Sequence, residues 1–173
     1  MDEDAVVAAQ IGRPLRSAAP AAVRCHLGLP VVVLVPPLLD DGTPFPTRYW
    51  LCCPLALRRV GRLESAGGVA AMERRAGSDP GFSRRLEEAH RRYAAERDAA
   101  LAGAPGPLPS GGVGGAREGI KCLHAHYADH AVGHDNPVGE LVAPWVEPLD
   151  CPDPCVVEAA GRAVTNPRWR EPR

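Results

Sequence analysis

Residues 29–35, Leu-Pro-Val-Val-Val-Leu-Val, form a run rich in β-branched side chains between Gly28 and the pair Pro36-Pro37. Such a run is typical of a buried strand. The following segment, Asp40-Asp-Gly-Thr-Pro-Phe-Pro-Thr47, is dense in residues that favour turns, and it leads into a second strand candidate at 48–52. We therefore predict a small antiparallel hairpin or short sheet within residues 23–53.

Helical signals surround this sheet. Pro54 fits the first turn of a helix that Gly67-Gly68 would end, and Asp79 with Pro80 fits the start of the longest helix. The predicted helices span residues 3–11, 54–66, 79–101 and 120–132. The expected fold class is α+β, a small sheet packed by three to four helices, with helices dominating.

Length and composition limit the organisation of the chain. The 173 residues, with a mass of 18.3 kDa, predict a single compact domain, which we place at residues 1–140. Residues 141–173 are rich in proline, and we predict a C-terminal extension that is partly disordered. The 20 Lys and Arg against 21 Asp and Glu give no basic excess for non-specific nucleic-acid binding.

The ends and apolar stretches of the chain bear on its compartment. The sequence begins Met-Asp-Glu-Asp, which is acidic where a secretory signal is basic. The longest apolar stretch, residues 29–39, is interrupted by prolines and too short to span a membrane. We expect a cytoplasmic protein without membrane partners, in which the six cysteines are reduced thiols or metal ligands.

The cysteines and histidines offer a metal site. Cys122 and His126 lie four residues apart on a predicted helix, a spacing that suits zinc, and thiolates also suit an iron–sulfur cluster. Further ligands would come from distant segments: Cys25, Cys53, and Cys155 or its neighbour Cys151. The predicted metal ligands are Cys25, Cys53, Cys122, His126 and Cys155. The alternative is that these cysteines are small buried hydrophobes and no metal binds.

A second group of residues suggests an anion site. Lys121 is the single lysine of the chain, and it follows a glycine-rich segment at 110–115. His90 and Arg97 share the inward stripe of the long predicted helix. We predict that His90, Arg97, Lys121 and His124 bind a small anion, since backbone N–H groups and cationic side chains favour negative charge. The alternative is that His90 and Arg97 bind backbone carbonyls and the loop carries no ligand.

Several blocks together resemble a known family. These blocks include Asp41-Gly-Thr-Pro-Phe-Pro-Thr47, Tyr49-Trp-Leu-Cys-Cys-Pro54, Gly119-Ile-Lys-Cys-Leu-His-Ala-His-Tyr-Ala128 and Asn136-Pro-Val-Gly139. Over roughly residues 10–140 the chain resembles the bacterial domain of unknown function 501. The resemblance implies one compact bacterial domain without an established activity. It places Cys25, Cys53, Cys122, His124, His90, Tyr93 and Arg97 inside recognisable blocks, whereas Cys52 stands where the pattern more usually has Thr.

Two functional hypotheses remain. The first is a Cys/His metal protein, holding zinc or an iron–sulfur cluster, beside a cationic cleft for a small anion. Four protein ligands would make the metal structural, whereas three ligands and a water would allow hydrolysis. The second is a metal-free protein–protein interaction module without catalytic activity, in which the loop at 42–47 and the terminal segments meet a protein partner. The sequence names no reaction.

Overall fold

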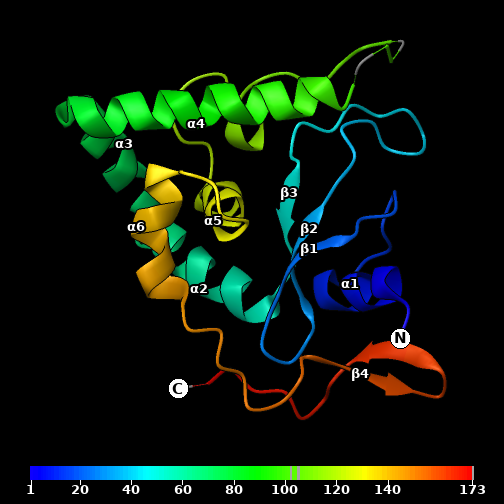
Figure 1. The fold of residues 1–173 in the computed structure, drawn as a ribbon. Helices are drawn as coiled ribbons and strands as arrows, with labels where there is room; N and C mark the ends of the chain where they lie inside the picture. Colours follow the sequence, from blue (N-terminus) through cyan, green and yellow to red (C-terminus); the bar gives the residue numbers. More distant parts are fainter. Residues whose placement is uncertain (102, 105, 173) are drawn as a thin grey trace.

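The computed structural model describes residues 1–101, 103–104 and 106–172 (Figure 1). Within them the elements follow the order α1 (Glu3–Ile11), β1 (Ala21–Arg24), β2 (Pro30–Leu34), β3 (Tyr49–Leu51), α2 (Pro54–Ser65), α3 (Gly68–Ser78), α4 (Pro80–Ala99), η1 (Val113–Gly115), α5 (Leu123–Ala131), α6 (Pro137–Val146), β4 (Val156–Ala159) and β5 (Arg162–Thr165). Helices outweigh two small antiparallel sheets, which confirms the predicted α+β class.

The predicted hairpin is the centre of the larger sheet. β2 pairs antiparallel with β3, with Val33 opposite Trp50, and β1 adds a third strand on the other side of β2. Val31, Val32 and Val33 are each at most 1% exposed. A strand buried on both faces explains the continuous β-branched run, because neither side chain direction meets water.

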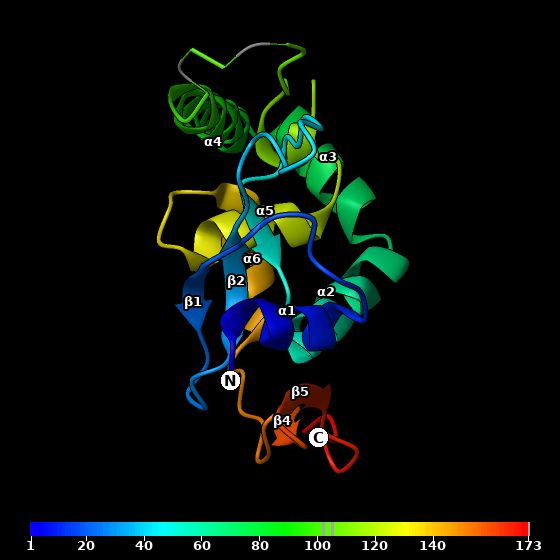
Figure 2. The same ribbon diagram turned by 90° about the vertical axis from the view of Figure 1, so that its right-hand side faces the viewer.

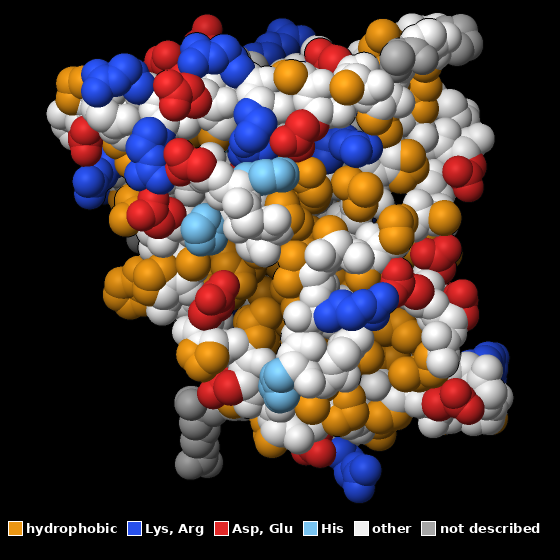
Figure 3. All heavy atoms as spheres, viewed as in Figure 1, with side chains coloured by type: hydrophobic (Ala, Val, Ile, Leu, Met, Phe, Trp, Pro, Cys, Tyr) orange, Lys and Arg blue, Asp and Glu red, His pale blue; other side chains and the backbone are white. Residues whose placement is uncertain are grey.

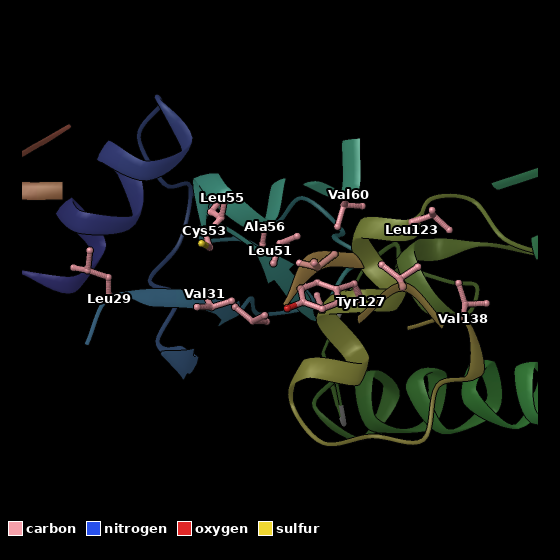
Figure 4. Packing of buried hydrophobic residues seen from close by; sticks show 14 of the residues in the cluster. Leu29, Val31, Leu51, Cys53, Leu55, Ala56, Val60, Leu123, Tyr127 and Val138 are labelled. Atoms are coloured by element: carbon pink, nitrogen blue, oxygen red, sulfur yellow. The ribbon is translucent and has the colours of Figure 1, made fainter. Parts of the chain in front are cut away.

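Helix α5 lies at the middle of the molecule. In Figure 1 it lies between the sheet and α6, with α4 running across one end of the molecule. Figure 4 shows Tyr127 of α5 between the sheet residues Val31 and Leu51 and the helix residue Val138. All four side chains are nearly fully buried. The hydrophobic contacts of α5 therefore join the sheet to the helices.

The long helix α4 begins where the sequence predicted, at a capping residue, whereas α5 begins three residues later than predicted. The Asp79 carboxylate accepts the N–H groups of Gly81 and Phe82 at the start of α4. Helix α5 begins at Leu123 rather than at residue 120. The N–H groups of Ile120 and Leu123 donate to the carboxylates of Glu73 and Glu64, on α3 and α2. The predicted start was too early because these side chains hold Ile120 and Lys121 outside the helix.

The C-terminal segment contains regular structure that the sequence analysis missed. Helix α6 spans the expected domain boundary at residue 140, and the Asn136 side chain caps it by accepting the Gly139 N–H at 3.0 Å. The hairpin of β4 and β5 packs against α1 near the C-terminus (Figure 2). Cys155, Val156 and Trp169 belong to the main hydrophobic cluster. Residues 141–172 thus contribute to the same core as the rest of the domain.

Charged side chains are mixed on the face shown in Figure 3. Basic and acidic groups alternate along the edge where Figure 1 places α4, and hydrophobic side chains gather at the centre of this face. In the part of the chain that is described, no helix combines the length and the apolar character needed to cross a membrane.

Candidate functional site

Four of the six cysteines line one narrow pocket. Cys25 follows β1, Cys53 precedes α2, and Cys151 and Cys155 lie between α6 and β4. The free volume inside the pocket is about 10 Å³, close to the space that one water-sized sphere requires. Figure 4 shows the Cys53 sulfur beside Leu55 at the margin of the hydrophobic cluster. The pocket is therefore of the size of a single small ion.

N–H groups approach two of these sulfurs. The indole Nε1–H of Trp169 donates to Cys151 Sγ at 3.4 Å, and the amide Nε2–H of Gln10 donates to Cys155 Sγ at 3.5 Å. Such donors favour a thiolate over a thiol, because the thiolate carries the charge. Burial acts in the opposite direction: it raises the pKa of Cys53 to about 11 and raises the pKa of Cys155. In the free protein these two thiols are protonated at neutral pH.

The predicted metal ligands do not all meet in this pocket. Cys25, Cys53 and Cys155 line it together with Cys151, which the sequence offered only as the neighbour of Cys155. Cys122 lines a different cleft. As the side chains stand in the described residues, no three Cys, His, Asp or Glu groups are placed to hold one metal ion.

His126, the other predicted ligand, is buried in a polar network. Its Nδ1 lies 3.0 Å from Asn136 Oδ1, which also accepts the Gly139 N–H. An amide oxygen only accepts, so Nδ1 carries the proton and Nε2 does not. No hydrogen-bond partner for Nε2 is found in the described part of the chain. Burial lowers the pKa of His126 to about 4, so the ring is neutral.

Asp129 is the centre of this network. Its fully buried carboxylate accepts two hydrogen bonds from Arg92, at 3.2 and 2.6 Å, and one from Asn136 Nδ2 at 2.9 Å. His134 Nδ1 lies 3.0 Å from the same carboxylate. These partners compensate the buried charge and connect α4 to α5. The sequence analysis missed this network, although the density of polar residues at 126–136 was a signal for it.

His90 and Arg97 hold the glycine-rich loop against α4. His90 Nδ1 accepts the Val113 N–H at 3.0 Å, and its Nε2 lies 3.1 Å from the Gly119 carbonyl oxygen. Arg97, which is 3% exposed, donates to the Gly111 carbonyl oxygen. A Cβ on Gly112 would lie 2.2 Å from His90 Nδ1, so this close approach requires glycine. Of the two interpretations left open for these residues, binding to backbone carbonyls is the one observed.

Lys121 and His124 lie in a larger cleft, separate from the contacts of His90 and Arg97. This cleft has a volume of about 630 Å³. Its walls come from the end of α1, from β3, α2 and η1, and from the residues around the start of α5: Gln10, Ile11, Arg13, Thr47, Tyr49, Trp50, Leu51, Leu57, Gly114, Lys121, Cys122, His124 and Ala125. The Glu64 carboxylate, 3.0 Å from His124 Nδ1, fixes the imidazole ring. Of the four residues predicted to bind an anion, His90 and Arg97 hold the glycine-rich loop. The other two, Lys121 and His124, line the cleft.

Comparison with known proteins places the chain. The family model described as "Protein of unknown function (DUF501)" matches residues 21–144. The chain belongs to this family. Apart from Gln10, Ile11 and Arg13, all residues that line the cleft fall inside the DUF501 match, whereas Cys151 and Cys155 lie beyond it. No curated protein and no solved structure matches the chain.

Proposed function

We propose that this protein binds one zinc ion through Cys25, Cys53, Cys151 and Cys155. The observation that carries the proposal is the convergence of these four thiols on one pocket of single-ion size. Four thiolates suit zinc, which they bind tetrahedrally. An iron–sulfur cluster contains several iron and sulfide atoms and needs more space than this pocket offers. Four protein ligands leave no open position, so the zinc is structural.

As they stand, the four cysteines do not form a metal-holding group, so zinc binding requires their sulfurs to turn toward one point in the pocket. Cysteine has a single side-chain torsion before its sulfur, and a change of rotamer moves the sulfur without moving the backbone. The ion is expected to draw the four sulfurs to about 2.3 Å from it. The N–H groups of Trp169 and Gln10 then donate hydrogen bonds to the thiolates of Cys151 and Cys155 and orient these ligands.

The second part of the proposed function is the binding of a small anion in the cleft. Two permanent cations, Arg13 and Lys121, line the cleft, and none of its described lining residues is Asp or Glu. The carboxylate of Glu64 lies behind the wall, paired with His124 at 3.0 Å. Gln10 lines both the cleft and the cysteine pocket, so the two sites are neighbours. A ligand in the cleft is therefore bound beside the zinc and not by it.

The alternative function is a metal-free interaction module. The exposed Trp145 on α6, at 70% exposure, is a side chain that a protein partner would cover. The loop at 42–47 favours it less, because Asp41 at its start pairs with Arg16 at 2.6 Å and Phe45 packs on Trp50 at 5.4 Å. This loop is thus already occupied by contacts within the chain.

Elemental analysis of the full chain, purified without chelators, tests the zinc site. We expect about one zinc per chain. Cys53→Ser and Cys151→Ser are expected to lose the zinc, whereas Cys122→Ser, which changes a thiol outside the pocket, keeps it. A wild-type protein without metal, or with a disulfide between Cys151 and Cys155, contradicts the proposal and favours the alternative. Iron and sulfide in place of zinc would refute the argument from pocket size.

Thermal stabilisation by inorganic phosphate tests the anion site separately. Lys121→Ala is expected to remove the stabilisation. Arg117→Ala removes an exposed cation four residues earlier that does not line the cleft, and is expected to keep it. Equal loss in both variants would indicate a general charge effect and contradict the site.

A further inference from the structure

We infer that the ligand of the cleft is an organic phosphate or carboxylate that carries an aromatic ring. This inference rests on the proposed anion binding and adds the class of ligand. The cleft, at about 630 Å³, lies within the range of roughly 300–1,000 Å³ usual for small-molecule sites. An inorganic anion alone would leave most of this space filled with water.

The charged end of the ligand is recognised by Arg13 and Lys121, whereas His124, which also lines the cleft, is paired with Glu64 at 3.0 Å. Neither Arg13 nor Lys121 takes part in an ion pair within the described part of the chain. Ten of the 17 other described arginines do have such a partner. Arg16, for comparison, pairs with Asp41 at 2.6 Å. The two cleft cations are thus available to an anion from solution.

The aromatic end is recognised by the walls of β3. Tyr49 and Trp50 line the cleft beside Leu51 and Leu57. The Arg13 guanidinium lies 5.6 Å from the centre of the Trp50 ring, so a cation and an aromatic surface are presented side by side. A ligand whose ring packs on this wall keeps its anionic group next to Arg13.

An adjoining apolar pocket extends this wall. It has a volume of about 80 Å³ and shares Ile11, Arg13 and Trp50 with the cleft. Its other walls include Val33, Leu39 and Phe45. Apolar space next to a cationic cleft fits a ligand with two unlike ends, because burying the ring releases water while the anion stays paired.

Titration calorimetry of the purified full chain with three matched probes tests the inference: phenyl phosphate, inorganic phosphate and phenol. Phenyl phosphate is expected to bind about tenfold or more tightly than inorganic phosphate, since an aromatic contact and its buried area add to the ion pairs. Phenol, which lacks the anion, is expected to show no binding. Benzoate and adenosine monophosphate then distinguish a carboxylate ligand from a nucleotide.

The variants separate the two ends of the ligand. Trp50→Leu is expected to weaken phenyl phosphate while leaving inorganic phosphate unchanged, and Lys121→Ala to weaken both. If inorganic phosphate binds as tightly as phenyl phosphate to the wild type, the aromatic inference is wrong while anion binding stands. If neither binds, both fail. The comparison of probes on the wild type decides the question even where Trp50→Leu does not fold.

Discussion

The cysteine pocket and the cationic cleft share Gln10 as a wall, yet they differ in almost every other respect. The pocket is narrow and is lined by thiols and apolar groups. The cleft is wide and basic, and most of its walls come from β3 and the residues around the start of α5. A narrow thiol pocket suits a structural metal, whereas an open cleft with unpaired cations suits a ligand that exchanges with solvent. This contrast separates the proposed zinc site from the proposed ligand cleft.

The largest expected effect is a loss of thermal stability when a cysteine of the pocket is replaced and the cleft is left intact. Cys53→Ser removes a zinc ligand, and the binding energy lost is also folding energy, so we expect the melting temperature to fall by more than about 10 °C. Cys122→Ser, in the cleft, is the matched control and is expected to change it little. Calorimetry of both variants checks this. Equal melting temperatures would remove Cys53 from the ligand set.

The next effect distinguishes residues that hold the loop from residues that face the cleft. Arg97→Ala leaves the Gly111 carbonyl without its donor and opens a cavity, so we expect a loss of about 2–4 kcal/mol in the free energy of unfolding. Lys121→Ala, at an exposed position, is expected to cost less than about 0.5 kcal/mol. Urea denaturation measures both. A stable Arg97→Ala protein with weakened anion binding would restore Arg97 to the anion site.

Zinc affinity in the pocket is expected to depend on pH more strongly than anion binding in the cleft. Burial raises the pKa of Cys53 to about 11, so its thiol must lose a proton when zinc binds. Lowering the pH therefore weakens zinc, by at least about tenfold per pH unit for one released proton. Competition with a chelator between pH 8 and 6 provides the measurement. Anion binding in the cleft requires no thiol to lose a proton, and a pH-independent zinc affinity would argue against thiol ligands.

The smallest expected effect is a change in zinc affinity when Gln10, which lines both sites, is replaced. Gln10→Leu removes the N–H donor to Cys155 Sγ, and outer partners of metal ligands are typically worth about tenfold or more in affinity. We expect zinc affinity to fall by about tenfold while phenyl phosphate binding in the cleft changes less. Chelator competition and calorimetry on the same preparation report the two values. Unchanged zinc affinity would show that this donor does not support the site.

Local signals in the sequence account for most of the fold. Helix α1, predicted at residues 3–11, and the start of α2 agree with the structure, because Asp2, Gly12 and Pro54 act at the helix ends through local contacts. Helix α6 was missed although Asn136-Pro137 is a typical start, because the proline-rich composition after residue 140 predicted an irregular extension. Local signals thus predicted both ends of α1, α2 and α4 to within two residues, whereas the start of α5 depends on contacts with Glu64 and Glu73 on other helices.

The candidate site was less accessible from the sequence. The spacing of Cys122 and His126 fits a metal pair on a helix, but it does not reveal which face of the helix each side chain takes. His126 is turned to Asn136, and Cys122 lines the cleft. The grouping of Cys151 with Cys25 depends on how the C-terminal segment packs under α1, which no local pattern encodes. Lys121, singled out as the single lysine after a glycine-rich segment, and His124 both line the cleft, while their binding of an anion stays a prediction.

The positions of the four pocket cysteines along the chain set an order of events during synthesis. Cys25 and Cys53 leave the ribosome before Cys151 and Cys155, which lie about 100 residues further along the chain. Domains begin to fold from their N-terminal side while synthesis continues. The sheet and α2 can therefore assemble, with Cys25 and Cys53 in place, before Cys151 and Cys155 are available. If the proposed zinc site forms, its four-thiol set is complete only after Cys155 has emerged, and the ion is loaded after that point.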